Sequence, residues 1–98
     1  MKTSSEIEKI LKSNLESLKK DYNLNSVGIF GSYLRGEQKT NSDLDILVDF
    51  KKPISLIKFI RLENDLSRII GIKVDLVMKN ALKPAIGKRI LEEIKYVS

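Results

Sequence analysis

The sequence has no cysteine and no histidine, and this absence excludes several kinds of chemistry. Disulfide scaffolds, thiol nucleophiles, imidazole bases and zinc sites built from these residues are all ruled out. Tryptophan is also absent, and the aromatic residues are three tyrosines and three phenylalanines. Any catalysis must therefore use carboxylates, hydroxyl groups, lysine, arginine or a bound metal ion.

Long apolar runs and clusters of cations are missing too. The longest apolar stretch, around residues 46–48, is far shorter than the ~20 residues of a membrane helix. The N-terminal segment MKTSSEIEKI lacks the apolar core of a signal peptide, so we expect a cytoplasmic protein without membrane contact. The net charge of +5 suits a phosphate-bearing partner. The cations are scattered from Lys2 to Lys95, however, so direct nucleic-acid binding is not expected.

The length of 98 residues predicts a single domain over residues 1–98 with a thin core. Three- and four-residue apolar spacing predicts helices, whereas alternation or a short apolar run predicts a strand. The expected order is a helix at 3–22, a strand at 27–30, a helical turn at 33–36, a strand at 43–50, a helix at 55–70, a strand at 73–77 and a helix at 84–96. This order predicts an α/β (α+β) fold in which helices pack on a small sheet.

Individual residues predict where the helices begin and end and which faces they bury. Thr3 with Glu6, or Ser5 with Glu8, has the spacing of a capping box at the start of the first helix. Gly71 is expected to end the long middle helix. The residues expected to face inward from the last two long helices are Leu56, Phe59, Ile60, Leu66, Ile70, Ile86, Ile90, Leu91 and Ile94.

Two carboxylates share one face of the strand predicted at 43–50. Asp43 and Asp45 are two residues apart, so their side chains point the same way, with Cα atoms roughly 6.5–7 Å apart. Like charges repel at this distance, and aspartate is unfavourable in a strand. A divalent cation such as Mg²⁺ relieves the repulsion by binding the carboxylate oxygens. The alternative is a solvated outer face without a metal.

The dipeptide Gly31-Ser32 lies where the strand at 27–30 passes into a helical turn. Free backbone N–H groups at such a point attract anions, Gly31 lets a phosphate approach the main chain, and the Ser32 hydroxyl adds a donor. Arg35 can pair with phosphate oxygens through two hydrogen bonds. The alternatives are an ordinary strand-to-helix turn and a solvated arginine. Next to the two aspartates, this turn suggests a site for an Mg²⁺-nucleotide.

A third carboxylate, Asp75, interrupts the apolar strand predicted at 73–77. A charge in such a strand is costly unless it has a partner. If this strand lies beside the strand of Asp43 and Asp45, the three carboxylates form the kind of cluster that two-metal phosphoryl transfer requires. A salt bridge with Lys73, or an edge position, is the structural alternative.

A known family shows the same arrangement of motifs. Gly31-Ser32, ten residues and then Asp43-Leu44-Asp45 resemble the Gly-Ser-x10-Asp-x-Asp signature of DNA-polymerase-β-type nucleotidyltransferases. The string GSYLRGEQKTNSDLDILVDF, with VDLV later and KPAIGKRILEEIKYV at the end, is similar to the minimal nucleotidyltransferases, or MNT domains, from Ser26 onward. Leu34 stands where many relatives carry alanine. The resemblance implies a polymerase-β-type fold with a small mixed sheet of about three or four strands.

The resemblance also implies an activity, which is transfer of a nucleoside monophosphate from ATP or another nucleoside triphosphate with release of pyrophosphate. It implies that Asp43 and Asp45 hold two Mg²⁺ ions. By the same resemblance, Asp75 is expected to hold the catalytic ion and to help deprotonate the attacking hydroxyl. Gly31 and Ser32 are expected to bind the β- and γ-phosphates, and we expect Arg35 to be a further phosphate ligand.

The short chain leaves no room for the additional domains of polymerases, tRNA-tailing enzymes or antibiotic nucleotidyltransferases. Stand-alone MNT proteins resemble antitoxins that pair with a helical HEPN toxin, an RNase, and silence it by adding AMP to a tyrosine. The resemblance therefore implies a HEPN-type toxin as partner in a hetero-oligomer. The alternatives are a non-catalytic antitoxin that masks its partner, a nucleotidyltransferase for another hydroxyl-bearing substrate, and a basic nucleic-acid-binding module.

Overall fold

The computed structural model describes residues 2–98, and within this range it contains four strands, four α-helices and one 3₁₀ helix. In chain order these are α1 (Ser4–Tyr22), β1 (Leu24–Phe30), α2 (Ser32–Arg35), β2 (Leu44–Phe50), α3 (Leu56–Ile70), β3 (Val74–Met78), η1 (Lys79–Ala81), α4 (Pro84–Glu93) and β4 (Lys95–Tyr96). None of the helices described is both long and apolar enough to span a membrane.

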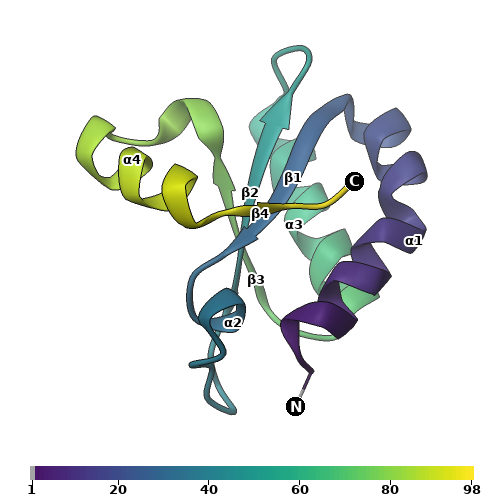
Figure 1. Cartoon of the computed structure of the whole chain (residues 1–98). Helices are drawn as coiled ribbons and strands as arrows, with labels where there is room; N and C mark the ends of the chain where they lie inside the picture. Colours follow the sequence, from purple (N-terminus) through teal and green to yellow (C-terminus); the bar gives the residue numbers. More distant parts are fainter. Residues whose placement is uncertain (1) are drawn as a thin grey trace.

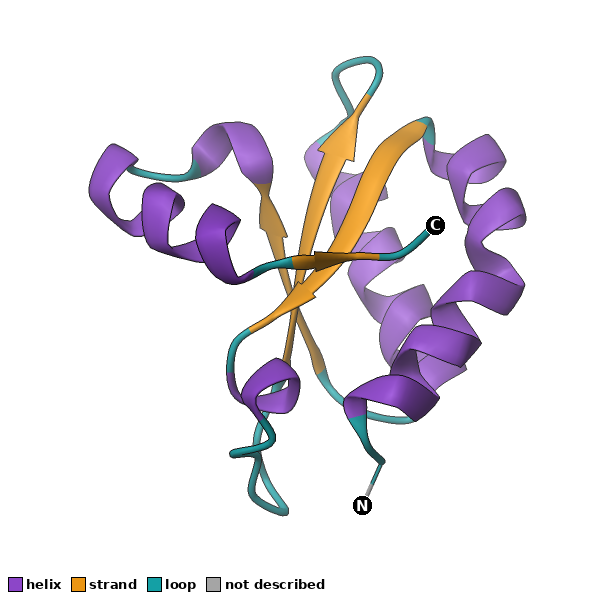
Figure 2. Cartoon of the chain, in the orientation of Figure 1, coloured by secondary structure: helices purple, strands orange, loops and turns teal. Residues whose placement is uncertain are grey.

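The strands form one mixed sheet in the order β3-β2-β1-β4. β1 pairs antiparallel with β2 and β4, whereas β2 and β3 run parallel. A parallel pair requires a crossover connection, and α3 provides it. Figures 1 and 2 show α1 and α3 side by side on one face of the sheet, with α4 on the opposite side. The predicted α/β class with a small mixed sheet is confirmed.

Alternation along β2 determines which face is buried under α1 and α3. Leu44, Ile46 and Val48 are fully buried in the main core, which residues of α1 and α3 also build. Successive side chains of a strand point to opposite faces, so Asp45 lies on the other face, toward α4. Asp45 is therefore on the face that the two long helices leave open.

The ends of the two long helices follow the sequence signals. Thr3 and Glu6 form the capping box expected at the start of α1. Gly71 ends α3 in the left-handed conformation, with a φ of 79°. A hydrogen bond from the Tyr22 hydroxyl to Asp65 joins the end of α1 to α3. The two helices are thus fixed to each other, and the sheet has a rigid support.

The inward face predicted for α3 is wrong at two positions. Leu56 is 74% exposed and Ile60 is 47% exposed, while the buried stripe runs through Leu62, Leu66 and Ile70. At 3.6 residues per turn, Ile60 lies on nearly the opposite side of the helix from Leu62. Leu56 is in the first turn of α3, before the buried stripe begins.

The helix predicted at 84–96 is too long. α4 ends at Glu93, and Lys95–Tyr96 form β4, which pairs with Gly28 and Ile29 of β1. Gly28 makes this possible because a Cβ there would overlap the Ile94 side chain. Pairing with the free edge of β1 replaces the last turn of the helix.

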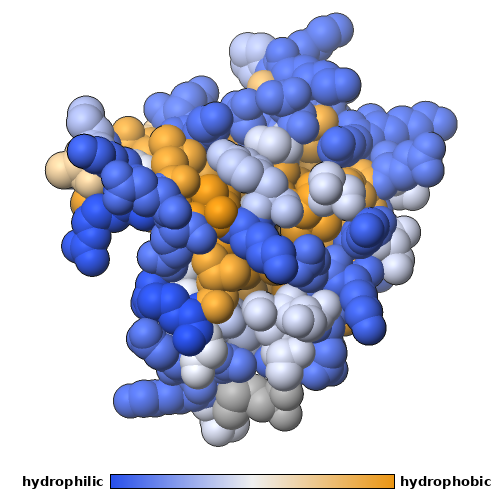
Figure 3. Space-filling view, viewed as in Figure 1, coloured by the Kyte–Doolittle hydropathy of each residue, from blue (hydrophilic) through white to orange (hydrophobic). Residues whose placement is uncertain are grey.

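Two residues expected to be buried in this helix are exposed. Ile86 and Leu91 reach the surface, and Figure 3 shows apolar surface around α4. Ile90 and Ile94 are half-buried. Figure 1 shows α4 projecting away from the sheet, so its apolar face is not fully covered.

Candidate active site

The site is built on the parallel pair of β2 and β3. Asp45 and Asp75 are direct register partners on the two strands. Asp43 lies immediately before β2, where Leu44 N–H donates to the Lys73 carbonyl at 2.8 Å. The structure therefore places β3 beside β2, as the three-carboxylate hypothesis requires. Asp45 and Asp75 lie on the face opposite α1 and α3, because their strand neighbours Leu44, Ile46, Val74 and Leu76 are in the main core.

The surroundings of Asp75 distinguish between the three settings expected for it, namely a carboxylate cluster, a salt bridge with Lys73 and an edge position. β3 is an edge strand and Asp75 is exposed, which makes a charge tolerable there. No ion pair joins Asp75 to Lys73 in the part of the chain that the structure describes. Its partner on the neighbouring strand is instead Asp45, which carries the same charge.

The carboxylates create an unbalanced negative charge. Partial burial, the charges of Asp75 and Asp43, and hydrogen bonding with Asp75 together raise the pKa of Asp45 to about 6. The positive charge of Arg35 acts in the other direction but does not cancel these effects. A cation bound among these oxygens would remove the repulsion, so the chemistry of the donor set fits a hard divalent ion.

The protein side chains alone do not complete such a site. Among residues 2–98, no group of three or more histidine, cysteine, aspartate or glutamate side chains is arranged so that it could hold a metal ion by itself. Mg²⁺ is commonly held by one or two carboxylates together with oxygens of a substrate phosphate. A triphosphate beside Asp45 and Asp75 would supply the missing oxygens.

The predicted phosphate turn lies directly against this pair. Gly31 has a φ of +82°, and a Cβ there would overlap Oδ2 of Asp45. Only glycine combines this conformation with so close an approach. Ser32 follows as the first residue of α2, half-buried. Gly31 and Ser32, read from the sequence as an anion-binding turn, are therefore adjacent to the carboxylates.

Arg35 is held by two glutamates rather than lying free in solvent. Its Nη1 atom is 2.7 Å from Oε1 of Glu93, and its Nε atom is 3.3 Å from Oε1 of Glu37. The same Glu93 oxygen accepts a hydrogen bond from Gly31 N–H at 2.8 Å. Sequence reasoning missed Glu93, because 58 residues separate it from Arg35 and nothing in α4 marks it as different from Glu92.

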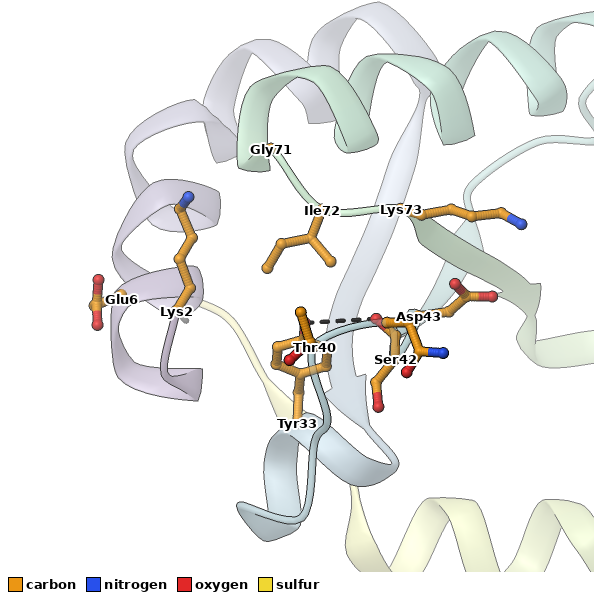
Figure 4. Close-up of a pocket in the computed structure, with 10 residues that line it drawn as sticks. Lys2, Glu6, Tyr33, Thr40, Ser42, Asp43, Gly71, Ile72 and Lys73 are labelled. Atoms are coloured by element: carbon orange, nitrogen blue, oxygen red, sulfur yellow. Dashed lines mark hydrogen bonds between the residues drawn. The ribbon is translucent and has the colours of Figure 1, made fainter.

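A polar cavity of about 730 Å³ opens beside Asp43. Figure 4 shows it between the start of α1, the loop that precedes β2 and the connection from α3 to β3. The Tyr33 hydroxyl donates to the Ser42 carbonyl across its floor, and Lys73 lies at its rim. No sequence pattern predicts this cavity, because it forms only where three distant segments meet.

Comparison with known proteins identifies the family. The model of the nucleotidyltransferase domain family matches residues 5–97. The chain belongs to this nucleotidyltransferase family. The protein adenylyltransferase MntA of Thermococcus cleftensis is 50% identical over 97 residues, which cover 99% of this chain and 98% of the relative.

Solved structures agree with this assignment. A structure assigned as a minimal nucleotidyltransferase superposes with a TM-score of 0.76 and 32% identity, over 89% of each chain. A toxin–antitoxin structure with AMP-PNP superposes with a TM-score of 0.74 and 26% identity, over 89% of this chain and 72% of that one. The resemblance to minimal nucleotidyltransferases is thus confirmed, and the protein is a nucleotidyltransferase by family.

Because the pKa of Asp45 is raised, we expect the folding stability of this nucleotidyltransferase to depend on pH. Its pKa is raised on folding, from 3.8 to about 6, so the folded state binds the proton more tightly than the unfolded state. The contribution of protonated Asp45 to the folding stability is fully present below pH 4 and is lost as the pH rises through 6. Because Asp45 is partly exposed, solvent screening reduces the effect to about 1 kcal/mol.

We therefore expect Asp45→Asn to melt about 4–8 °C above the wild type at pH 7.5 in a chelator, and near the wild type at pH 4. Asp49→Asn is the matched control, because Asp49 lies further along the same strand and accepts a hydrogen bond from Asn25 at 3.0 Å. Thermal melts at the two pH values measure the difference. A variant that melts below the wild type at both would contradict the raised pKa.

Proposed function

We propose that this nucleotidyltransferase is the antitoxin of a HEPN/MNT pair and transfers AMP from ATP to a tyrosine of its partner toxin in a Mg²⁺-dependent reaction. The observation that carries the proposal is the facing pair of carboxylates, Asp45 and Asp75, directly beside the Gly31 turn. Carboxylates for a metal and a main-chain turn for phosphate are the two parts that transfer from a nucleoside triphosphate requires.

The position of each residue gives it a distinct role in the proposed reaction. Asp43 and Asp45 would hold the two metal ions and Asp75 the catalytic one, and Asp45 lies directly against the Gly31 turn. Gly31 and Ser32 bind the β- and γ-phosphates. Arg35, at the end of α2, is a further ligand of the same phosphates in this proposal. Bound Mg²⁺ supplies charge neutralisation of the triphosphate and a lowered pKa of the attacking hydroxyl.

Asp75 serves the acceptor. It is exposed on the edge strand β3, so a hydroxyl of a second protein can reach it. Its carboxylate helps to take the hydroxyl proton while the tyrosine oxygen forms a bond to the α-phosphorus. The bond between the α-phosphorus and the bridging oxygen breaks, and pyrophosphate leaves with that oxygen.

The choice of a protein acceptor is supported by the relatives and by the surface. The MntA relative is named a protein adenylyltransferase, and a structural neighbour is a toxin–antitoxin complex with AMP-PNP. The edge position of Asp75 leaves the carboxylates open on the side where an acceptor must approach. A partner that brings its own docking surface can present a tyrosine there.

Growth rescue tests the proposal in cells. The protein and a HEPN toxin encoded next to it are co-expressed, with the wild type compared with the Asp43→Ala/Asp45→Ala double variant. We expect rescue by the wild type only. Rescue by both, at equal expression and with unmodified toxin, would show an antitoxin that masks its partner by binding and would contradict the enzymatic proposal.

A further inference from the structure

One carboxylate oxygen joins α4 to the turn that begins α2. Oε1 of Glu93 accepts the hydrogen bond from Gly31 N–H at 2.8 Å and lies 2.7 Å from Nη1 of Arg35. Glu93 is 30% exposed, whereas Glu37, the second partner of Arg35, is 61% exposed and lies 3.3 Å from it. The Glu93 contact is therefore the shorter and better shielded of the two, and such contacts hold a guanidinium more firmly.

The α2 helix cannot fix these groups by itself. It consists of the single turn Ser32–Arg35, and its N-cap, Gly31, has no side chain to accept a capping bond. A single helical turn is unstable without contacts from outside. The orientation of the Gly31 peptide and of the Arg35 side chain therefore depends on neighbouring elements, and Glu93 contacts both.

The same peptide determines the distance to the carboxylates. Because Gly31 lies against Oδ2 of Asp45, any rotation of its peptide changes the space between the phosphate turn and Asp45. The φ of +82° does not hold this peptide in place by itself, since glycine can rotate to other conformations at little cost. A hydrogen bond to a carboxylate from a separate helix supplies the missing restraint.

We propose that Glu93 is a positioning residue for nucleotidyl transfer, which holds Gly31 and Arg35 so that the next N–H of the turn, that of Ser32, and the remaining N–H groups of Arg35 can receive the triphosphate. This inference rests on the proposed function, because it assumes that the triphosphate binds at the Gly31 turn. Glu93 acts through the two residues that it contacts. Glu93 is the last residue of α4, and only Ile94 separates it from β4, so the Gly31 turn is also linked to the C-terminal strand.

Four variants test this role. Glu93→Ala removes the oxygen, and Glu93→Gln keeps an oxygen that can accept both bonds. Glu92→Ala removes the neighbouring charge on α4, and Glu37→Ala removes the other partner of Arg35; neither contacts Gly31 among the hydrogen bonds and ion pairs of residues 2–98. The affinity for a Mg²⁺-bound non-hydrolysable ATP analogue is measured by calorimetry, and the Gly31 amide is followed in ¹H–¹⁵N spectra.

We expect Glu93→Ala to weaken analogue binding by about fivefold or more and to move the Gly31 amide proton upfield. Glu93→Gln should stay within about threefold of the wild type, and the two controls within about twofold. Should Glu93→Ala fail to fold, Glu93→Asp replaces it, because its shorter side chain cannot reach both donors. An unchanged Gly31 amide in the variant would overturn the proposal.

The direction of the binding change distinguishes a second role. A carboxylate that occupied the place of a phosphate oxygen would compete with the triphosphate, and Glu93→Ala would then bind the analogue more tightly. That result would overturn positioning in favour of competition. A wild type that binds no Mg²⁺-nucleotide would contradict the proposed function instead, and the Gly31 amide shift would still decide whether Glu93 restrains the turn.

Discussion

We expect Asp75→Asn to lower the rate of AMP transfer at saturating ATP by more than about tenfold and to change the affinity for Mg²⁺-ATP by less than about threefold. In the proposed mechanism Asp75 acts on the attacking hydroxyl, so its contribution is largest in the transition state. Its exposed place on β3, beside Asp45, agrees with a role toward the acceptor. Transfer is measured by mass spectrometry of the toxin, and affinity by calorimetry.

Unfolding of the variant would not give slower transfer together with a nearly unchanged affinity for Mg²⁺-ATP. Asp75 is exposed and its charge repels that of Asp45, so Asp75→Asn should melt no lower than the wild type in metal-free buffer at neutral pH. Asp49→Asn is the matched control, because it removes an aspartate further along β2 that contacts Asn25. Transfer by Asp75→Asn at the wild-type rate would show that this carboxylate is only structural.

The second large effect is expected at Asp45. Asp45→Asn should weaken binding of Mg²⁺-ATP by about tenfold or more, because the amide is a poorer ligand for a hard cation than a carboxylate. Asparagine has nearly the same shape, so the contact with Gly31 is retained. The informative quantity is the ratio of the affinities measured with Mg²⁺ and with a chelator, which should be large for the wild type and close to one for the variant.

This ratio separates metal binding from other effects of the substitution. Removing a negative charge also favours binding of the triphosphate, but it does so both with Mg²⁺ and with chelator, so this effect largely cancels in the ratio. Asp49→Asn should keep the wild-type ratio. Equal affinity for ATP with and without metal in the wild type would contradict a metal site at Asp43 and Asp45.

The local features of the fold could be predicted from the sequence. The capping box of Thr3, the end of α3 at Gly71 and the alternation along β2 depend on neighbouring residues, so the sequence pattern was sufficient. The spacing of Gly31-Ser32 and the two aspartates after it is also local. It is sufficient to predict that the Gly31 turn and the two aspartates belong to one site, and the structure brings Gly31 and Asp45 together.

Features that depend on distant contacts were predicted poorly. β4 has two residues, and it forms because Gly28 leaves room for Ile94 beside β1. Apolar spacing alone predicts that this segment is the end of a helix. The bond from Gly31 to Glu93 spans 62 residues, and no spacing rule predicts it. The sequence predicts Asp75 beside Asp45 only if their two strands are neighbours, and neither strand's own residues determine the strand order.

One measurement tests the central claim most directly, namely the intact mass of the purified HEPN toxin after incubation with ATP, Mg²⁺ and this protein. We predict a mass increase of one or more AMP units, located on a tyrosine by fragmentation. The increase should be absent with a chelator and with the Asp43→Ala/Asp45→Ala variant. An unmodified toxin that nevertheless forms a stable complex with the wild-type protein would contradict the account.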